Sequence, residues 1–184
     1  EKRKEFLNKN NLRFLRYYQV DAIKAIQSKI KNGSDRFLLE MATGTGKTTT
    51  SAAIIKMFLR LYKVNRVLFL VDRLELETQA KKEINDILQN DFETAIWKEN
   101  KDDWRRANIV ISTVQSFTKN NKYKRIFKPN SFDLVISDEA HRSLGKSSRN
   151  VFEYFIGFKL GLTATPRDFL KSVNEDDMSM TDPK

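Results

Sequence analysis

The sequence predicts an α/β protein with a mostly parallel central sheet and helices on both of its faces. Short apolar runs alternate along the chain with longer segments whose apolar residues recur at helical spacing. The apolar runs are continuous rather than alternating, which is typical of strands buried on both faces of a parallel sheet. With 184 residues, the chain has the length of one compact domain. This combination favours an open α/β layer fold.

The strands and helices of this fold are expected in the following places. The strands are residues 36–40, 67–71, 94–97, 109–112, 134–137 and 158–162. The helices carry apolar faces made of Val20, Ile23, Ile26 and Ile30, then Ile55, Phe58, Leu59 and Tyr62, then Leu76, Ala80, Ile84 and Ile87, with Asp72 as the expected cap of the last. We expect the domain to span residues 1–170, with 1–35 as a helical lead-in and 171–184 as a linker or disordered tail.

The composition excludes several classes of function. The chain has no cysteine and one histidine, which excludes a disulfide scaffold and argues against a histidine-based metal centre. No apolar run reaches the roughly 20 residues that a membrane helix needs, and no signal peptide is visible, so we expect a cytoplasmic protein. The net charge of +10 suggests an anionic partner such as nucleic acid, although a merely solvated basic surface gives the same balance.

A glycine-rich loop follows the first predicted strand. Residues 42–48 read Ala-Thr-Gly-Thr-Gly-Lys-Thr and precede a helix, which is the context of a phosphate-binding loop. Glycines allow backbone N–H groups to converge on phosphate oxygens, and the helix N-terminus favours the same anion. The expected nucleotide-binding residues of this loop are Thr43, Gly44, Thr45, Gly46, Lys47, Thr48 and Thr49. The strict pattern has glycine where Met41 stands, and the alternative is a glycine-rich turn with an exposed lysine.

An acidic pair follows the fifth predicted strand, where residues 138–141 read Asp-Glu-Ala-His. Ligands of doubly wound sheets bind at the carboxyl ends of the strands, so we expect these carboxylates beside the phosphate loop, on a neighbouring strand. Asp138 and Thr48 would then hold Mg²⁺. Lys47 would contact the β- and γ-phosphates of a nucleoside triphosphate, and Glu139 would orient the attacking water. The alternative is an ordinary acidic loop.

Together these residues resemble the first RecA-like domain of superfamily 2 helicases and translocases, from about Arg13 to Arg167. The loop has the Ala-x-x-Gly-x-Gly-Lys-Thr form of that superfamily, which accounts for Met41, and residues 138–141 match its DEAH motif. The resemblance implies that Gln19, in Arg-Tyr-Tyr-Gln at 16–19, reads adenine. It also implies that His141, Thr163 and Thr165 couple the state of ATP to domain movement.

Longer stretches are similar to the motor of type I restriction enzymes, in the R subunit, and they are residues 41–48, 67–73, 136–143 and 161–169. This resemblance implies an ATP-driven translocase of duplex DNA that uses ATP and Mg²⁺. It also implies a second RecA-like domain and a nuclease domain, which these residues do not supply, and specificity and modification subunits as partners. A type III restriction subunit, another superfamily 2 DNA or RNA helicase, a P-loop kinase and a module that only binds nucleotide and nucleic acid are the alternatives.

The same resemblance gives three candidates for nucleic-acid contact, which are Arg73, Thr113 and Gln115. Arginine donates charge-assisted hydrogen bonds to phosphate, and such backbone contacts position a duplex without reading its bases. Each candidate has a structural alternative. Arg73 would form an ion pair with Glu75 or Glu77, and Thr113 and Gln115 would form a helix cap and its first turn.

Two further features are interpreted as structural. The lysines and arginine between residues 119 and 128 are expected to lie in a solvated loop. Trp97 is expected in the core and Trp104 on a partly buried surface, although tryptophan side chains also stack on bases in proteins that bind single strands.

Overall fold

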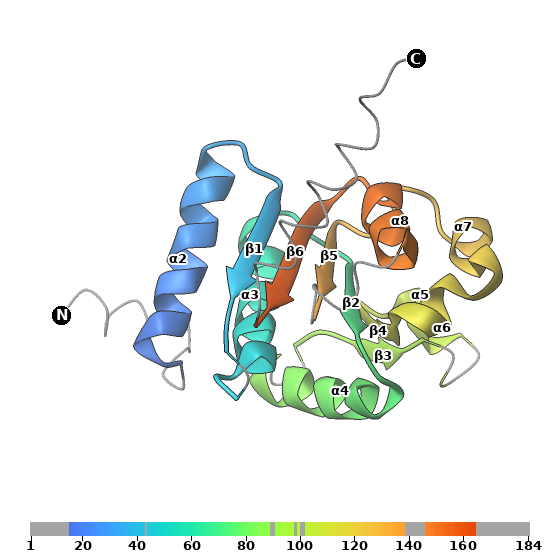
Figure 1. Ribbon diagram of the computed structural model, residues 1–184, viewed down its shortest axis with the longest axis horizontal. Helices are drawn as coiled ribbons and strands as arrows, with labels where there is room; N and C mark the ends of the chain where they lie inside the picture. The colour runs from blue at the N-terminus through green and yellow to red at the C-terminus, as the bar shows by residue number, and fades with distance from the viewer. Residues whose placement is uncertain are drawn as a thin grey trace, which may run out of the picture.

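A parallel sheet forms the centre of the computed structural model (Figure 1). The structure describes residues 15–42, 44–88, 91–97, 99, 102–138 and 146–164, without the side chains of 146–148. Within these residues the sheet has six strands in the order β1-β6-β5-β2-β4-β3, and every neighbouring pair is parallel. The predicted α/β fold with helices on both faces is therefore confirmed.

The strands coincide with the predicted apolar runs to within a residue at their ends. They are β1 (Arg36–Glu40), β2 (Val67–Val71), β3 (Thr94–Ile96), β4 (Ile109–Thr113), β5 (Leu134–Ser137) and β6 (Phe158–Thr163). The helices are α2 (Tyr17–Lys31), α3 (Lys47–Leu61), α4 (Leu74–Leu88), α5 (Asp103–Arg106), α6 (Val114–Thr118), the 3₁₀ turn η1 (Lys119–Asn121), α7 (Lys122–Ile126) and α8 (Lys146–Tyr154).

The two faces of the sheet are covered by different sets of helices. Val67, Phe69 and Val71 of β2 pack with apolar residues of α2, α3 and α4. Leu68 and Leu70, which point the other way, pack with an aromatic cluster from α5 to α8 and the segments between them. Figure 1 shows α2 beyond β1 at one end of the sheet and α5 to α8 gathered toward the other end. Burial on both faces explains why the strand sequences are continuously apolar.

Several expectations from the sequence need correction. Trp104 is only 6% exposed and stacks edge-on against Trp97, so it belongs to the core rather than to a partly buried surface. Helix α4 begins at Leu74, so Asp72 lies one residue too early to be its cap. The basic segment after Thr118 forms η1 and α7 rather than a loop, although its lysines and arginine are exposed as expected.

The expected helical lead-in is represented by α2, whose Val20, Ile23 and Ile26 are buried. Residues 1–14 and the expected tail at 171–184 lie outside the described residues, so the predicted domain boundaries stay predictions. Among the described helices none has the length and apolar character required to span a bilayer.

Candidate functional site: a phosphate loop and its surroundings

The glycine-rich loop connects the carboxyl end of β1 to the first turn of α3. Thr45 closes a turn here, because its backbone N–H and its hydroxyl both donate to the carbonyl of Ala42, at 3.3 and 2.6 Å. Gly44 has a φ of +76°, and open space lies where its Cβ would be. Met41 is buried, and its N–H donates to the carbonyl of Thr163 at 2.8 Å. No described atom therefore blocks the space beside the Gly44 backbone, which is compatible with a phosphate loop.

Helix α3 begins at this loop with groups suited to an anion. Gly46 is its N-cap and has a left-handed φ of +81°. Lys47 is the first helical residue and is only 9% exposed. The hydroxyl groups of Thr50 and Ser51 donate to the carbonyls of Gly46 and Lys47, at 2.9 and 2.8 Å, and so hold the first turn. The buried lysine contradicts the alternative of a turn with an exposed lysine.

Gln19 lies against the loop, as the adenine-reading prediction requires, but its side chain already has protein partners. Its Nε2 donates to the carbonyls of Thr45 and Gly46 at 3.4 and 3.3 Å. Its Oε1 accepts from the backbone N–H of Arg16 at 2.8 Å. Both amide hydrogens are therefore engaged, and only one lone pair of Oε1 is left for an adenine amino group. Adenine recognition by Gln19 stays a prediction.

Two residues of this site were missed by the sequence reasoning. The hydroxyl of Tyr18 donates to the carbonyl of Thr45 at 2.8 Å, so α2 holds the loop through two adjacent side chains. The hydroxyl of Thr49, predicted to bind nucleotide, donates to the carboxylate of Glu83 in α4 at 2.5 Å. Tyr18 is adjacent to the predicted Gln19, which was a usable signal, whereas no local pattern marks Glu83. Thr48, predicted to bind Mg²⁺, is half-buried in the same turn.

Asp138 lies one strand further from the loop than expected. Strand β6 is between β1 and β5, so the phosphate loop and Asp138 are on strands that are not neighbours. Asp138 follows β5, and its N–H donates to the carbonyl of Leu70 at 2.8 Å. Thr163, the predicted coupling residue, ends β6 between them and is fully buried. The predictions for Thr43, Glu139, His141 and Thr165 lie outside the described residues.

The predicted nucleic-acid residues lie at the carboxyl ends of β2 and β4, which are neighbours in the sheet. Arg73 is exposed and pairs with Asp72 at 3.6 Å, not with Glu75 or Glu77. Thr113 is the N-cap of α6, because its hydroxyl accepts from the N–H of Ser116 at 3.1 Å, and Gln115 is exposed in that helix. The capping role is confirmed for Thr113, and nucleic-acid contact by these residues stays a prediction.

Glu77 is a further functional candidate that the sequence did not indicate. It is 8% exposed, and its carboxylate accepts from the backbone N–H of Thr113 at 2.6 Å. Burial raises the pKa of Glu77, the bond from Thr113 opposes that rise, and the nearby charge of Glu99 adds to it. From the sequence, Glu77 was only one of two alternative surface partners for an ion pair with Arg73. Its burial depends on the packing of α4 against β4.

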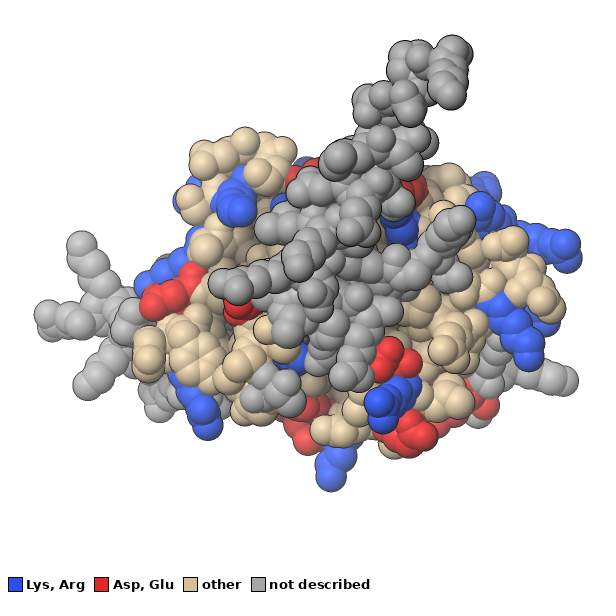
Figure 2. Space-filling model, viewed as in Figure 1, with Lys and Arg blue, Asp and Glu red and all other residues tan. Residues whose placement is uncertain are grey.

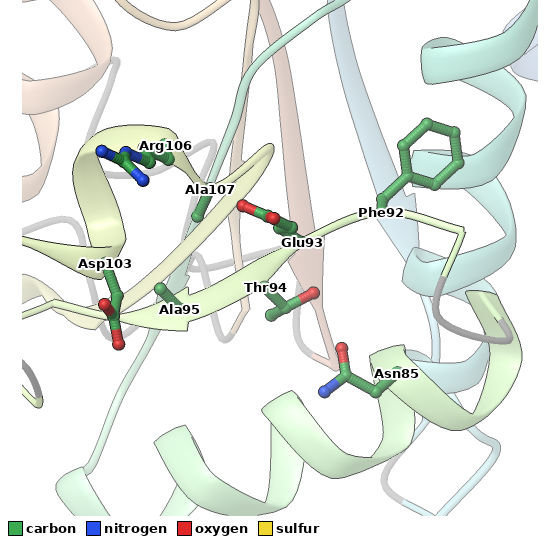
Figure 3. Close-up of a pocket in the computed structure, with 8 residues that line it drawn as sticks. All are labelled: Asn85, Phe92, Glu93, Thr94, Ala95, Asp103, Arg106 and Ala107. Atoms are coloured by element: carbon green, nitrogen blue, oxygen red, sulfur yellow. The ribbon is translucent and has the colours of Figure 1, made fainter.

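A cavity beside β3 is lined by residues that are distant in the chain from the phosphate loop (Figure 3). It has a volume of about 460 Å³ and lies beside β3, at the opposite end of the sheet from β1. Asn85 of α4 and Arg106 of α5 line it from different sides, and the Thr94 hydroxyl has no hydrogen-bond partner. The carboxylates of Glu93 and Asp103 also line it, which disfavours phosphate. This cavity is therefore not the nucleotide site.

The basic cluster of η1, α7 and the following residues also lies away from the phosphate loop. Its exposed members are Lys119, Lys122, Lys124, Arg125 and Lys128. Figure 2 shows lysine and arginine side chains at the margin formed by α7, far from α2 and the loop end of β1 (Figure 1). This position agrees with the interpretation of the cluster as a solvated surface.

Three features define a RecA-like P-loop domain of the helicase class. They are the parallel sheet, the phosphate loop between β1 and α3, and the insertion of β6 between β1 and β5, the strand that precedes Asp138. The likeness to solved structures agrees with this class. The UvsW helicase from bacteriophage T4 matches with a TM-score of 0.65 and 25% identity, over 83% of this chain and 53% of that chain. A nuclease-deletion mutant of the Type ISP restriction-modification enzyme LlaGI, in complex with a DNA substrate mimic, matches with a TM-score of 0.64 and 26% identity, over 83% and 17% of the two chains.

The chain belongs to the family described as "Type III restriction enzyme, res subunit", whose sequence model matches residues 13–168. Among curated proteins, the endonuclease subunit of the type I restriction enzyme EcoAI from Escherichia coli is 37% identical over 164 residues. That match covers 83% of this chain and 19% of the subunit, so the chain spans about a fifth of that relative. The resemblance to superfamily 2 motors and to type I restriction subunits is confirmed.

Proposed function

We propose that this chain is the ATP-binding half of the motor of an ATP-dependent DNA translocase, within a restriction endonuclease R subunit. One observation carries the proposal. The buried Lys47 begins α3 directly after an open glycine loop, and Asp138 lies at the same edge of the sheet, two strands away. Family membership supports the same function, because the relatives are restriction subunits and helicases.

The residues present fit ATP with Mg²⁺. The backbone of Gly44 to Gly46 and the N-terminus of α3 would bind the phosphates, and Lys47 would neutralise the terminal ones. The Thr48 hydroxyl and Asp138 would hold Mg²⁺, which supplies charge neutralisation at the phosphates when bound. Glu139 would orient the attacking water.

The chain supplies only part of such a machine. A second RecA-like domain would contribute the remaining catalytic groups, and a cationic finger of that kind is typically worth about 10³–10⁵ in rate. The chain alone would therefore bind nucleotide and nucleic acid and hydrolyse ATP slowly. In the complete polypeptide a nuclease domain, and in the assembly specificity and modification subunits, would provide cleavage and target recognition. We place this assembly in the cytoplasm, where the DNA that it acts on is found.

Duplex DNA is the proposed track. Arg73 is exposed at the carboxyl end of β2, and Gln115 is exposed beside it at the end of β4. Both would contact the phosphate backbone, which suits a motor that moves along any sequence. Since backbone contacts discriminate poorly between DNA and RNA, the choice of DNA depends on the restriction relatives.

The test is steady-state ATP hydrolysis by the complete polypeptide, without nucleic acid and with duplex DNA, single-stranded DNA or duplex RNA. Salt is kept low and constant, because phosphate contacts weaken steeply with ionic strength. We expect duplex DNA to stimulate ATP turnover, and we expect Lys47→Ala and Glu139→Gln to abolish this turnover. The control is Lys82→Ala, which changes an exposed lysine of α4 and should leave turnover unchanged. Turnover retained in Lys47→Ala would refute the assigned site. Stimulation by RNA or single strands alone would refute the DNA translocase.

A further inference from the structure

Helix α4 lies between the nucleotide site and the expected nucleic-acid face. It packs against α3, which begins at the phosphate loop, and also against β4, which ends at Thr113. Its own first residue directly follows Arg73. The core between these elements contains three buried residues of α4, namely Ala80, Ile84 and Leu88. The helix is therefore packed along its length.

The first link from α4 runs to the nucleotide site. Thr49 is the third residue of α3 and donates its hydroxyl hydrogen to Glu83 at 2.5 Å. Hydrogen bonds from a hydroxyl to a carboxylate are charge-assisted and about twice as strong as neutral ones. Thr49 stands next to Thr48, the proposed Mg²⁺ ligand. A shift of the first turn of α3 on phosphate binding would therefore move Glu83.

The second link from α4 runs to the nucleic-acid face. Glu77 accepts from the N–H of Thr113 at 2.6 Å, and Thr113 in turn caps α6, which carries Gln115. Because this bond is buried, losing Glu77 would leave the Thr113 N–H without a partner in the core. Glu77 and Glu83 are six residues apart, or about 9 Å along a helix of 1.5 Å rise per residue.

We propose that α4 couples the two sites, with Glu83 and Glu77 as positioning residues that transmit nucleotide occupancy from Thr49 to Thr113. This inference rests on the proposed function, since it requires that the protein bind both ATP and DNA. Helix α4 is bonded to α3 through Glu83 and to the end of β4 through Glu77, and a packed helix moves as a unit. The arrangement of α3 that bound nucleotide favours would therefore also favour one position of Arg73 and Thr113. Nucleotide and DNA would then change each other's affinity by the same factor.

The experiment measures this coupling factor in the complete polypeptide. The dissociation constant for a fluorescently labelled DNA duplex is determined by anisotropy with and without a non-hydrolysable ATP analogue and Mg²⁺, and the ratio is the coupling factor. Coupling factors are typically about 5–150. We expect Glu83→Ala, and separately the nearly isosteric Thr49→Val, to bring the factor at least about threefold closer to one. The double variant should go no further, because both changes remove the same bond.

Three controls separate coupling from folding and from charge. Asp86→Ala removes an exposed carboxylate from the same helix and should leave the factor unchanged. Glu83→Gln and Glu77→Gln keep an acceptor oxygen and should retain most of the factor, whereas Glu77→Ala should lose it. A merely destabilised variant would weaken both DNA affinities without changing their ratio.

The outcomes are distinct for the two proposals. A wild-type protein that fails to bind the analogue or the duplex would overturn the proposed function, and the inference with it. Normal wild-type coupling that persists unchanged in Glu83→Ala and Thr49→Val would overturn the inference alone. If Glu83→Ala does not fold, the coupling factor of Thr49→Val tests the inference, because that variant removes the same hydrogen bond by changing its donor.

Discussion

Substitution of Gly46 by alanine tests how the phosphate loop is held. Gly46 has a φ of +81°, which costs an L-residue about 1–2 kcal/mol. A Cβ at this position would also lie 2.8 Å from Nε2 of Gln19, which is too close. The carboxamide would have to leave, and with it the two long hydrogen bonds to the loop carbonyls and the short one from Arg16.

The expected loss of stability follows from these contacts. Each of the two long hydrogen bonds of Gln19 contributes about 0.5 kcal/mol and the short one about 1 kcal/mol. Loss of all three therefore costs about 2 kcal/mol in addition to the backbone strain. Gly46→Ala should therefore lower the free energy of unfolding by about 3–4 kcal/mol. Gly33→Ala is the matched control, since Gly33 has a φ of +83° and nothing within 4 Å of the Cβ position. It should lose only the strain, about 1–2 kcal/mol.

The assay is urea unfolding followed by circular dichroism, with Gln19→Ala and the Gln19→Ala/Gly46→Ala double variant included. Without Gln19 there is no carboxamide to displace, so Gly46→Ala should then cost no more than Gly33→Ala. An equal cost of Gly46→Ala and Gly33→Ala in the wild-type background would refute the reasoning. So would an undiminished cost of Gly46→Ala in the absence of Gln19.

Two other predictions follow from buried side chains. Burial raises the pKa of Glu77, so the folded state binds its proton more tightly than the unfolded state, and stability falls as pH rises from the ordinary glutamate pKa to the raised one. Glu77→Gln removes this dependence. The free energy of unfolding of the variant minus that of wild type should therefore be larger at pH 7 than at pH 4, and an equal difference at both pH values would contradict the assignment. Trp104→Ala should cost about 3–5 kcal/mol, because the ring is buried against Trp97 and Phe127, whereas a cost under about 1 kcal/mol in urea unfolding would place it on the surface.

The sequence was sufficient for the fold class and for the position of the glycine-rich loop between a strand and a helix, because both depend on local patterns. The continuous apolar run at residues 67–71 indicates a strand buried on both faces even when its neighbours are not known. Gly44, Gly46 and Lys47 lie within four consecutive residues, so their pattern can also be recognised locally. The order of the strands is different, since nothing local in β6 indicates that it inserts between β1 and β5. The bonds of Gln19 to the loop and of Thr49 to Glu83 also join distant segments, so residue type and spacing did not predict them.

The buried states of Glu77 and Trp104 were missed for a related reason. Both residues stand among charged neighbours, and a helical pattern assigns such neighbours to the solvent side. Glu77 is buried because the N–H of Thr113 lies where β4 ends and compensates its desolvation. Trp104 is buried because the short helix α5 folds onto the aromatic cluster, where Trp97 already supplies a face to pack against.

The coupling role of Thr163 stays a prediction, and the position of β6 in the sheet supports it. Strands in a sheet are about 4.8 Å apart, so β1 and β5, with β6 between them, are separated by about 10 Å. This is the distance that the end of a triphosphate and its cation would bridge, beyond the end of β6, if they bind between the loop and Asp138 as proposed. Thr163 ends the strand in that gap, and its carbonyl accepts from Met41 at the start of the loop. A change in the distance between the phosphate loop and Asp138 must therefore be accommodated across β6. Because Thr163 is fully buried and its carbonyl is hydrogen-bonded to Met41, we expect that it cannot absorb such a change locally.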